Sequence, residues 1–186
     1  LKNYKLGISE LKINQLLKLK RLLKKENIVS EIIVSTDVEK ILLFLRNKKD
    51  IIIHKRSKKL SSDNSLQSLI KLAPKLCNNN HILWTHVTSP LFDENEYINF
   101  IKEFFRKKYN SAFSSSIVNK FLMNHKKKWI SHDSKKIKWP KTQDLRTIYE
   151  VNSAAFMAKK KIYELYKDRL DNNPHPIISS KISSLD

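Results

Sequence analysis

The residues best placed to do chemistry follow an apolar run near the middle of the chain. The segment from His81 to Val87 predicts a buried strand. It carries His86 at its end and runs into the polar corner Thr88-Ser89-Pro90. In an open α/β sheet, ligands bind at the carboxyl ends of the strands. We therefore expect a ligand site at this corner.

Two other predicted strands also end in polar residues. A short buried strand from Ile32 to Val34 ends at Ser35-Thr36-Asp37, and the strand Ile51 to Ile53 is followed by a basic loop around Arg56. The carboxyl ends of parallel strands meet at one edge of a sheet. We therefore expect the ends of neighbouring parallel strands to bring Arg56, His86, Asn152 and Asp186 around one cleft.

Amphipathic helices alternate with these strands. Apolar residues at helical spacing predict helices over 9–25, 38–46, 65–76, 94–107 and 159–170. A further strand is expected from Val151 to Ala158, and a last extended segment from Pro174. This alternation predicts one α/β domain over residues 1–186, in three layers, with a mostly parallel sheet and right-handed crossovers.

The segment from Ser111 to Ile148 breaks this rhythm. It is polar and extended, with no long helical period. Antiparallel hairpins that project from the main sheet are expected here, with residues 117–150 forming an inserted lobe. Its residues Trp129 and Trp139 fit either an intramolecular core or a contact surface.

Composition narrows the classes of function. The 37 Lys and Arg residues against 18 Asp and Glu give a net charge of +19, which raises the alternative of a nucleic-acid-binding protein. The lysines are spread along the whole chain, however, and arginine is scarce. Solvated basic faces explain this pattern better than a specific nucleic-acid site.

Single residues exclude other classes. Gly7 is the only glycine, so a glycine-rich phosphate loop cannot form within this sequence. Cys77 is the only cysteine, so no internal disulfide can form. No apolar run approaches the roughly 20 residues of a membrane span. We expect a cytoplasmic protein that does not act in a membrane.

Several segments, read in order, resemble one family. They are VSTD at 34–37, Arg56 with Leu60 and Asp63, TSPL at 88–91, QDL at 143–145 and IYEVNSAAF at 148–156. Their order and spacing resemble the acylneuraminate cytidylyltransferases, that is, the CMP-sialic acid synthetases and relatives that act on other acidic nine-carbon sugars. The resemblance implies a nucleotide-diphospho-sugar transferase-like, Rossmann-like fold. It also implies transfer of CMP from CTP to the anomeric hydroxyl of an acidic sugar such as a nonulosonate.

The resemblance assigns residues to the nucleotide side of the site. Lys2 and Asn3 resemble the tail of a basic, glycine-containing loop that follows the family's first strand. Arg56 and Ser65 match segments that lie along the nucleotide, and Asp186 matches the first of two aspartates that hold Mg²⁺. The rest of the loop and the second aspartate have no counterpart, so we expect a chain trimmed at both ends that is inactive by itself.

The resemblance also assigns three residues to the sugar side of the site, namely His86, Asn152 and Phe156. His86 occupies the position where the family has glutamine, and it is also a candidate catalytic base. Family arginines on the sugar side are replaced here by Thr142 and Glu150. A sugar carboxylate then needs another cation, for which Lys141 and Arg146 are the candidates.

The resemblance also implies a homodimer formed through the lobe at 117–150. Two alternatives stay open beside the enzyme. One is a catalytically incomplete, dimerising scaffold with the same fold, and the other is the basic nucleic-acid-binding protein.

Overall fold

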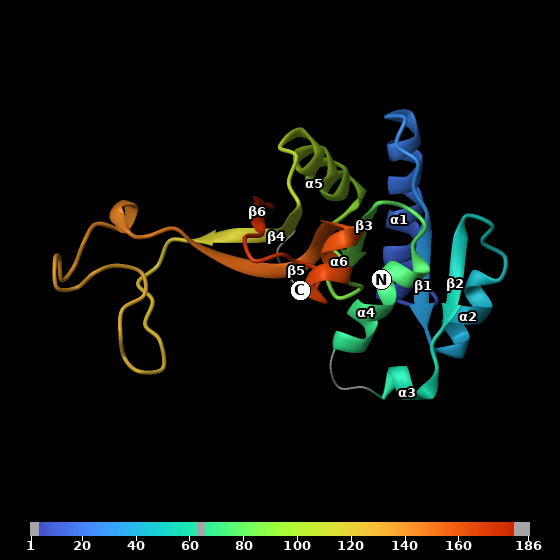
Figure 1. The fold of residues 1–186 in the computed structure, drawn as a ribbon, viewed down its shortest axis with the longest axis horizontal. Coiled ribbons are helices and arrows are strands. Elements are labelled where there is room, and N and C mark those ends of the chain that lie inside the picture. The colour runs from blue at the N-terminus through green and yellow to red at the C-terminus, as the bar shows by residue number, and fades with distance from the viewer. Residues whose placement is uncertain (1–3, 63–65, 181–186) are drawn as a thin grey trace.

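The computed structural model describes residues 4–62 and 66–180. Its strands form two sheets with helices on both faces (Figure 1). In the smaller sheet, β1 and β2 run parallel, and in the larger sheet the order is β3-β5-β4-β6. The strands span Ile32–Thr36 (β1), Ile51–Lys55 (β2), His81–Thr85 (β3), Ser111–Val118 (β4), Ile148–Lys159 (β5) and His175–Ile178 (β6).

Strand β5 is the exception to the parallel arrangement. It runs antiparallel to both of its neighbours, with Trp84 of β3 and Phe113 of β4 opposite Phe156. β4 and β6 are parallel. Residues directly opposite each other in an antiparallel pair point to the same face, so Trp84 and Phe156 lie side by side on one face of the sheet.

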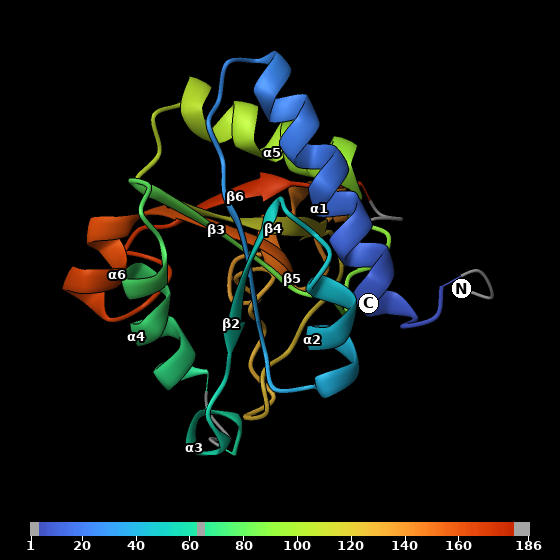
Figure 2. The same ribbon diagram turned by 90° about the vertical axis from the view of Figure 1, so that its right-hand side faces the viewer.

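The helices form the outer layers. They span Ile8–Lys25 (α1), Glu39–Leu45 (α2), Lys58–Ser61 (α3), Gln67–Leu76 (α4), Glu94–Arg106 (α5) and Lys160–Tyr166 (α6). Helices α1 and α5 pack on one face of the larger sheet, and α4 and α6 pack on the other (Figure 2). The predicted three-layer α/β fold is confirmed.

Helical spacing explains why α1 serves both sheets. Leu19 and Leu23 pack with α5 against β4 and β5. Ile13 packs with Ile32 of β1 and Ile51 of β2. One apolar stripe of a single helix therefore joins the small sheet to the large one.

The helix ends depart from the sequence predictions in detail. The helix expected from 159 to 170 stops at Tyr166, because Lys167 adopts a left-handed conformation with φ of 54°. No side chain of the polar corner at 35–37 caps α2, whose N-cap residue is Val38. Thr36 instead accepts a hydrogen bond from the Val38 amide.

Residues 119–147 project from the body between β4 and β5 (Figure 1). Apart from one short 3-10 helix, Thr142–Asp144, and an isolated bridge between Met123 and Trp129, the segment is irregular. Trp129 packs against Phe121 and Trp139 within it. The projecting segment thus holds its own small aromatic cluster.

Candidate functional site

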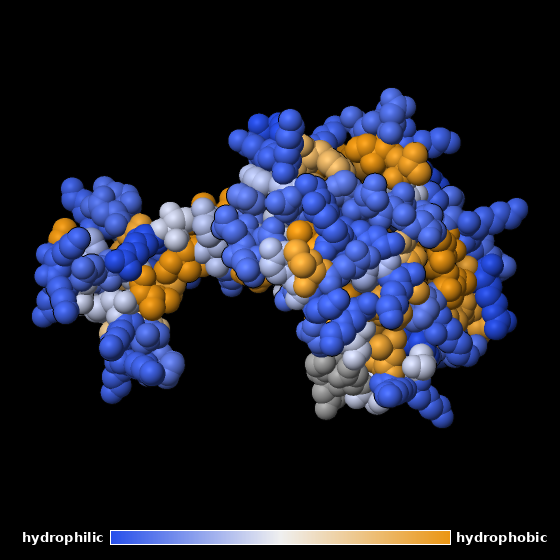
Figure 3. All heavy atoms as spheres, in the orientation of Figure 1, coloured by the Kyte–Doolittle hydropathy of each residue, from blue (hydrophilic) through white to orange (hydrophobic). Residues whose placement is uncertain are grey.

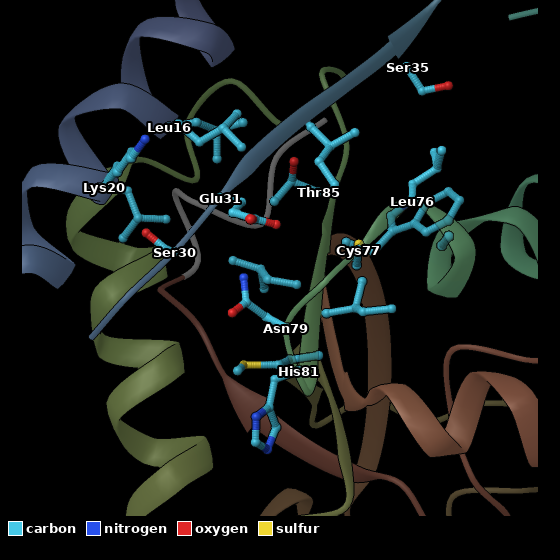
Figure 4. A pocket seen from close by; sticks show the side chains of 18 of the residues that line it. Leu16, Lys20, Ser30, Glu31, Ser35, Leu76, Cys77, Asn79, His81 and Thr85 are labelled. Atoms are coloured by element: carbon cyan, nitrogen blue, oxygen red, sulfur yellow. The ribbon is translucent and has the colours of Figure 1, made fainter. Parts of the chain in front are cut away.

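A cavity of about 770 Å³ lies between β1 and β3. Side chains of α1 and α4 also line it, and Figure 4 shows residues such as Leu16, Leu76 and Thr85 around the space. A volume of this size is typical of a site for a small ligand.

The backbone edges of β1 and β3 border this cavity. Within the described chain, β1 pairs only with β2 and β3 pairs only with β5. Consecutive residues line the space, from Ser30 to Ile33 on one side and from His81 to Thr85 on the other. Since successive strand residues point to opposite faces, contact by every residue means that the edge of each strand faces the cavity.

Arg56, which follows β2, and His86, which follows β3, both line the cavity. The Arg56 guanidinium donates through Nη2 to the Ser35 carbonyl at 2.9 Å. Its backbone amide donates to the Thr36 carbonyl, also at 2.9 Å. Its Nε is buried and has no hydrogen-bond partner in the structure. Arg56 is therefore held in place with donor capacity left over.

His86 and Phe156, both predicted on the sugar side, also come together. Their ring centroids are 6.2 Å apart in an edge-to-face arrangement. Both contact Arg169, a residue that sequence reasoning missed. Arg169 Nη1 lies 3.0 Å from His86 Nε2, and its guanidinium carbon lies 3.7 Å from the centroid of the Phe156 ring.

The contact with Arg169 occupies one ring nitrogen of His86. A guanidinium has no acceptor, so His86 Nε2 is the acceptor in this hydrogen bond. Service by Nε2 as a catalytic base would require Arg169 to move away, and the catalytic role of His86 stays a prediction.

The corner after β3 is anchored by a buried lysine. Lys12 of α1 is 2 % exposed. Its ammonium group donates to the carbonyls of Ser89 and Phe92, each at 2.8 Å, and to the Tyr97 hydroxyl at 3.2 Å. Burial lowers the pKa of Lys12 to about 8, against the opposing effect of nearby acidic residues. Gln15, one turn along α1, donates to the Pro90 carbonyl.

Asn152, the third predicted sugar-side residue, lies elsewhere. It is buried in β5, where its carbonyl oxygen accepts from the Ser114 hydroxyl and its amide donates to the Ser179 hydroxyl at 2.7 Å. It does not line the cavity that contains Arg56 and His86. Arg56 and His86 thus line one cavity and His86 contacts Phe156, whereas neither Phe156 nor Asn152 lines that cavity.

Lys2, Asn3, Ser65 and Asp186 lie outside the described residues. Over residues 4–62 and 66–180, no group of three or more His, Cys, Asp or Glu side chains could hold a metal ion. In the same residues, no helix is long and apolar enough to cross a membrane.

Lys141 and Arg146, the predicted replacement cations, belong to the projecting segment and are exposed. Figure 1 shows this segment well away from β3 within one chain. Arg169 was missed because it follows a helix and belongs to no motif. The only signal in the sequence is that it is an arginine in a chain whose basic residues are mostly lysine.

Comparisons with known proteins agree on the fold. No protein-family model matches the chain, and no curated protein matches it by sequence. Among solved structures, it resembles 4-diphosphocytidyl-2C-methyl-D-erythritol synthase from Anaerococcus prevotii DSM 20548. The TM-score is 0.64 at 12% identity, over 96% of this chain and 78% of that one.

A second solved structure is CMP:2-keto-3-deoxy-manno-octonic acid synthetase in complex with CTP. The TM-score is 0.50 at 9% identity, over 81% of this chain and 73% of that one. At such low identity the likeness concerns the fold alone. The chain therefore has the nucleotide-diphospho-sugar transferase-like, Rossmann-like fold that these two enzymes share.

Proposed function

We propose that the protein is a cytoplasmic nucleotidyltransferase that couples CTP to an acidic sugar and releases pyrophosphate. One observation carries the proposal: Arg56, which follows β2, and His86, which follows β3, line the same cavity between β1 and β3. The fold supports it, since both solved structures above bear names of cytidine-nucleotide enzymes.

In this reaction the anomeric hydroxyl oxygen of the sugar attacks the α-phosphorus of CTP. The bond from that phosphorus to the oxygen bridging the β-phosphate breaks, pyrophosphate leaves, and the hydroxyl proton passes to a base. Negative charge spreads over phosphate oxygens, so alignment and cationic side chains supply most of the catalysis. Arg56 would bind the nucleotide, and His86 and Phe156 would line the sugar pocket.

The cavity between β1 and β3 could hold the part of the nucleotide site that the family resemblance places ahead of Lys2. The family resemblance implies a strand and a basic, glycine-containing loop ahead of Lys2. Two facing strand edges border the cavity, and a strand inserted there would hydrogen-bond to both. A loop at the carboxyl end of that strand would then meet Arg56 and His86.

Mg²⁺ enters the proposal only through the resemblance at Asp186. It would supply positive charge against the triphosphate.

We also propose that the protein is a homodimer through the projecting segment. Trp139 is 64% exposed and Ile137 is 59% exposed, although both are apolar. Figure 3 shows hydrophobic residues gathered on this projection. Exposed aromatic and aliphatic side chains on one segment are typical of a protein contact.

The test is release of pyrophosphate from CTP by the full-length protein. We expect release only when Mg²⁺ and a nonulosonic or octulosonic acid are both present. No release over a panel of such sugars would remove the enzymatic function.

One observation favours the second candidate, an incomplete dimerising scaffold. Within the described residues, nothing pairs with the facing edges of β1 and β3. A scaffold would not bind CTP, so titration of the full-length protein with CTP separates the two functions.

A further inference from the structure

We propose that Arg169 binds the carboxylate of the acidic sugar and so selects anionic sugars over neutral ones. This inference rests on the proposed function. It assigns the sugar-side cation to a residue outside every motif of the sequence and replaces Lys141 and Arg146 as candidates within one chain.

Arg169 lies over two neighbouring aromatic rings. Its guanidinium carbon lies 3.7 Å from the centroid of Phe156 and 5.5 Å from that of Trp84. The two rings are neighbours on adjacent strands. A guanidinium stacked in this way keeps its N–H groups directed outward in its own plane, where they can meet a planar carboxylate.

The charge of Arg169 has no anionic partner in the chain as described. None of the described carboxylates forms a salt bridge with it within 4.0 Å; its neighbour Asp168 contributes only a weaker electrostatic effect. Its guanidinium makes one hydrogen bond to the described residues, to His86. Arg169 can donate five, so most of its donors are left for a ligand.

A second polar group near Arg169 also lacks a partner. Tyr163 is 1% exposed, and its buried hydroxyl has no hydrogen-bond partner in the structure. It is close enough to Arg169 for the two to interact electrostatically. Buried hydroxyl groups in folded proteins almost always have a hydrogen-bond partner. A bound ligand near Arg169 could supply that partner for Tyr163.

The position of Arg169 favours the sugar over the phosphates of CTP. It lies on the face of the sheet covered by α4 and α6, because it stacks on Trp84, which packs in that layer. Arg56 lines the cavity between β1 and β3, whereas Arg169 does not. His86 lines the cavity and touches Arg169. His86 therefore separates the proposed nucleotide site, which contains Arg56, from the proposed sugar site, which contains Arg169.

The experiment compares binding of acids and their methyl esters. The full-length protein is titrated with N-acetylneuraminate, with 2-keto-3-deoxyoctonate and with the methyl ester of each. We expect one of the acids to bind and its ester to bind about ten- to hundredfold more weakly, as for loss of a charge-assisted hydrogen-bonded pair. In Arg169→Gln, acid and ester should bind equally weakly.

Two further variants make the result specific. Arg146→Gln removes a rival cation and should keep the preference for the acid. Arg169→Lys keeps the charge but loses the planar fork, and it should recover only part of that preference. The apparent KM for CTP should be unchanged in Arg169→Gln.

The outcomes separate the inference from the proposed function. If an acid binds and Arg169→Gln still prefers it to the ester, the role of Arg169 is refuted while the proposed function stands. If Arg169→Gln instead raises the KM for CTP alone, the residue binds phosphate and the inference is likewise refuted. If neither acid binds the unaltered protein, both the acidic-sugar substrate and the role of Arg169 are overturned.

Discussion

The two regions on either side of His86 differ in packing: one is filled by side chains, and the other is a cavity. On the β5 side, Phe156 is 3% exposed and packs against His86 and Arg169. On the β1 side lies the cavity of about 770 Å³, bordered by two strand edges that pair with nothing among residues 4–62 and 66–180. Under the proposed function, the sugar-side contacts would lie within the described residues, whereas the nucleotide side would need residues beyond them.

The difference in packing predicts that shortening a side chain to alanine will lower the free energy of unfolding by different amounts on the two sides. Phe156→Ala should lower the free energy of unfolding by about 3–5 kcal/mol, because it removes a filled core ring. Leu72→Ala, on the wall of the cavity, should cost only about 1 kcal/mol because that side chain already borders a space. Chemical denaturation measures both. Equal losses would show that the two sides are packed alike.

The anchor at the corner after β3 gives the next largest effect. Lys12→Met removes the donor for two carbonyls and a hydroxyl and leaves them buried, so we expect a loss of about 2–3 kcal/mol in the free energy of unfolding. Lys18→Met is the matched control, since it breaks only an exposed ion pair with Glu94, and it should change stability little. A loss as small as that of the control would mean that Lys12 does not hold the corner.

The lowered pKa of Lys12 predicts a dependence of stability on pH. Burial brings this pKa from 10.5 to about 8. Between these values the unfolded chain binds a proton that the folded chain does not, so stability rises with pH, by at most about 1.4 kcal/mol per unit. Burial raises the pKa of Tyr97, which reverses the trend above about pH 10.

Denaturation at several values between pH 8 and 9.5, in the unaltered protein and in Lys12→Met, measures this slope by difference. Cys77, whose raised pKa acts in the opposite direction in this window, is common to both proteins. Lys12→Met should lack the contribution of Lys12. An identical slope in the variant would assign the dependence to other groups.

The smallest effect concerns Cys77, which lines the cavity. Burial raises the pKa of its thiol, so a thiol reagent should label it more slowly than a free cysteine at pH 8. If a strand enters the cavity, a longer natural form of the protein should be labelled more slowly still. The same rate in both forms would mean that the cavity stays open.

Much of this fold could be predicted from sequence. Apolar runs with period 2 or 3.6 give β1, β3 and α5 almost to the residue, because burial of one face imposes those periods. The antiparallel direction of β5 could not be predicted, since pairing partners are set by contacts between distant segments. The apolar run at 151–158 would look the same in either direction.

The site residues likewise fall into those that the sequence could predict and those that it could not. Arg56 and His86 each follow a predicted strand and line the same cavity, although their strands belong to different sheets. Arg169 could not be predicted, because only the left-handed turn at Lys167 and the packing of α6 bring it over Phe156. Asn152 fits the family motif, yet its amide bonds to Ser114 and Ser179, partners that no local pattern indicates.

The most direct test of the two-sided site is the kinetics of Arg56→Ala in the full-length protein. If Arg56 binds the nucleotide, the apparent KM for CTP rises about tenfold or more, while the apparent KM for the acidic sugar stays the same. An unchanged KM for CTP, or an equal rise for both substrates, would contradict the division of the cleft at His86.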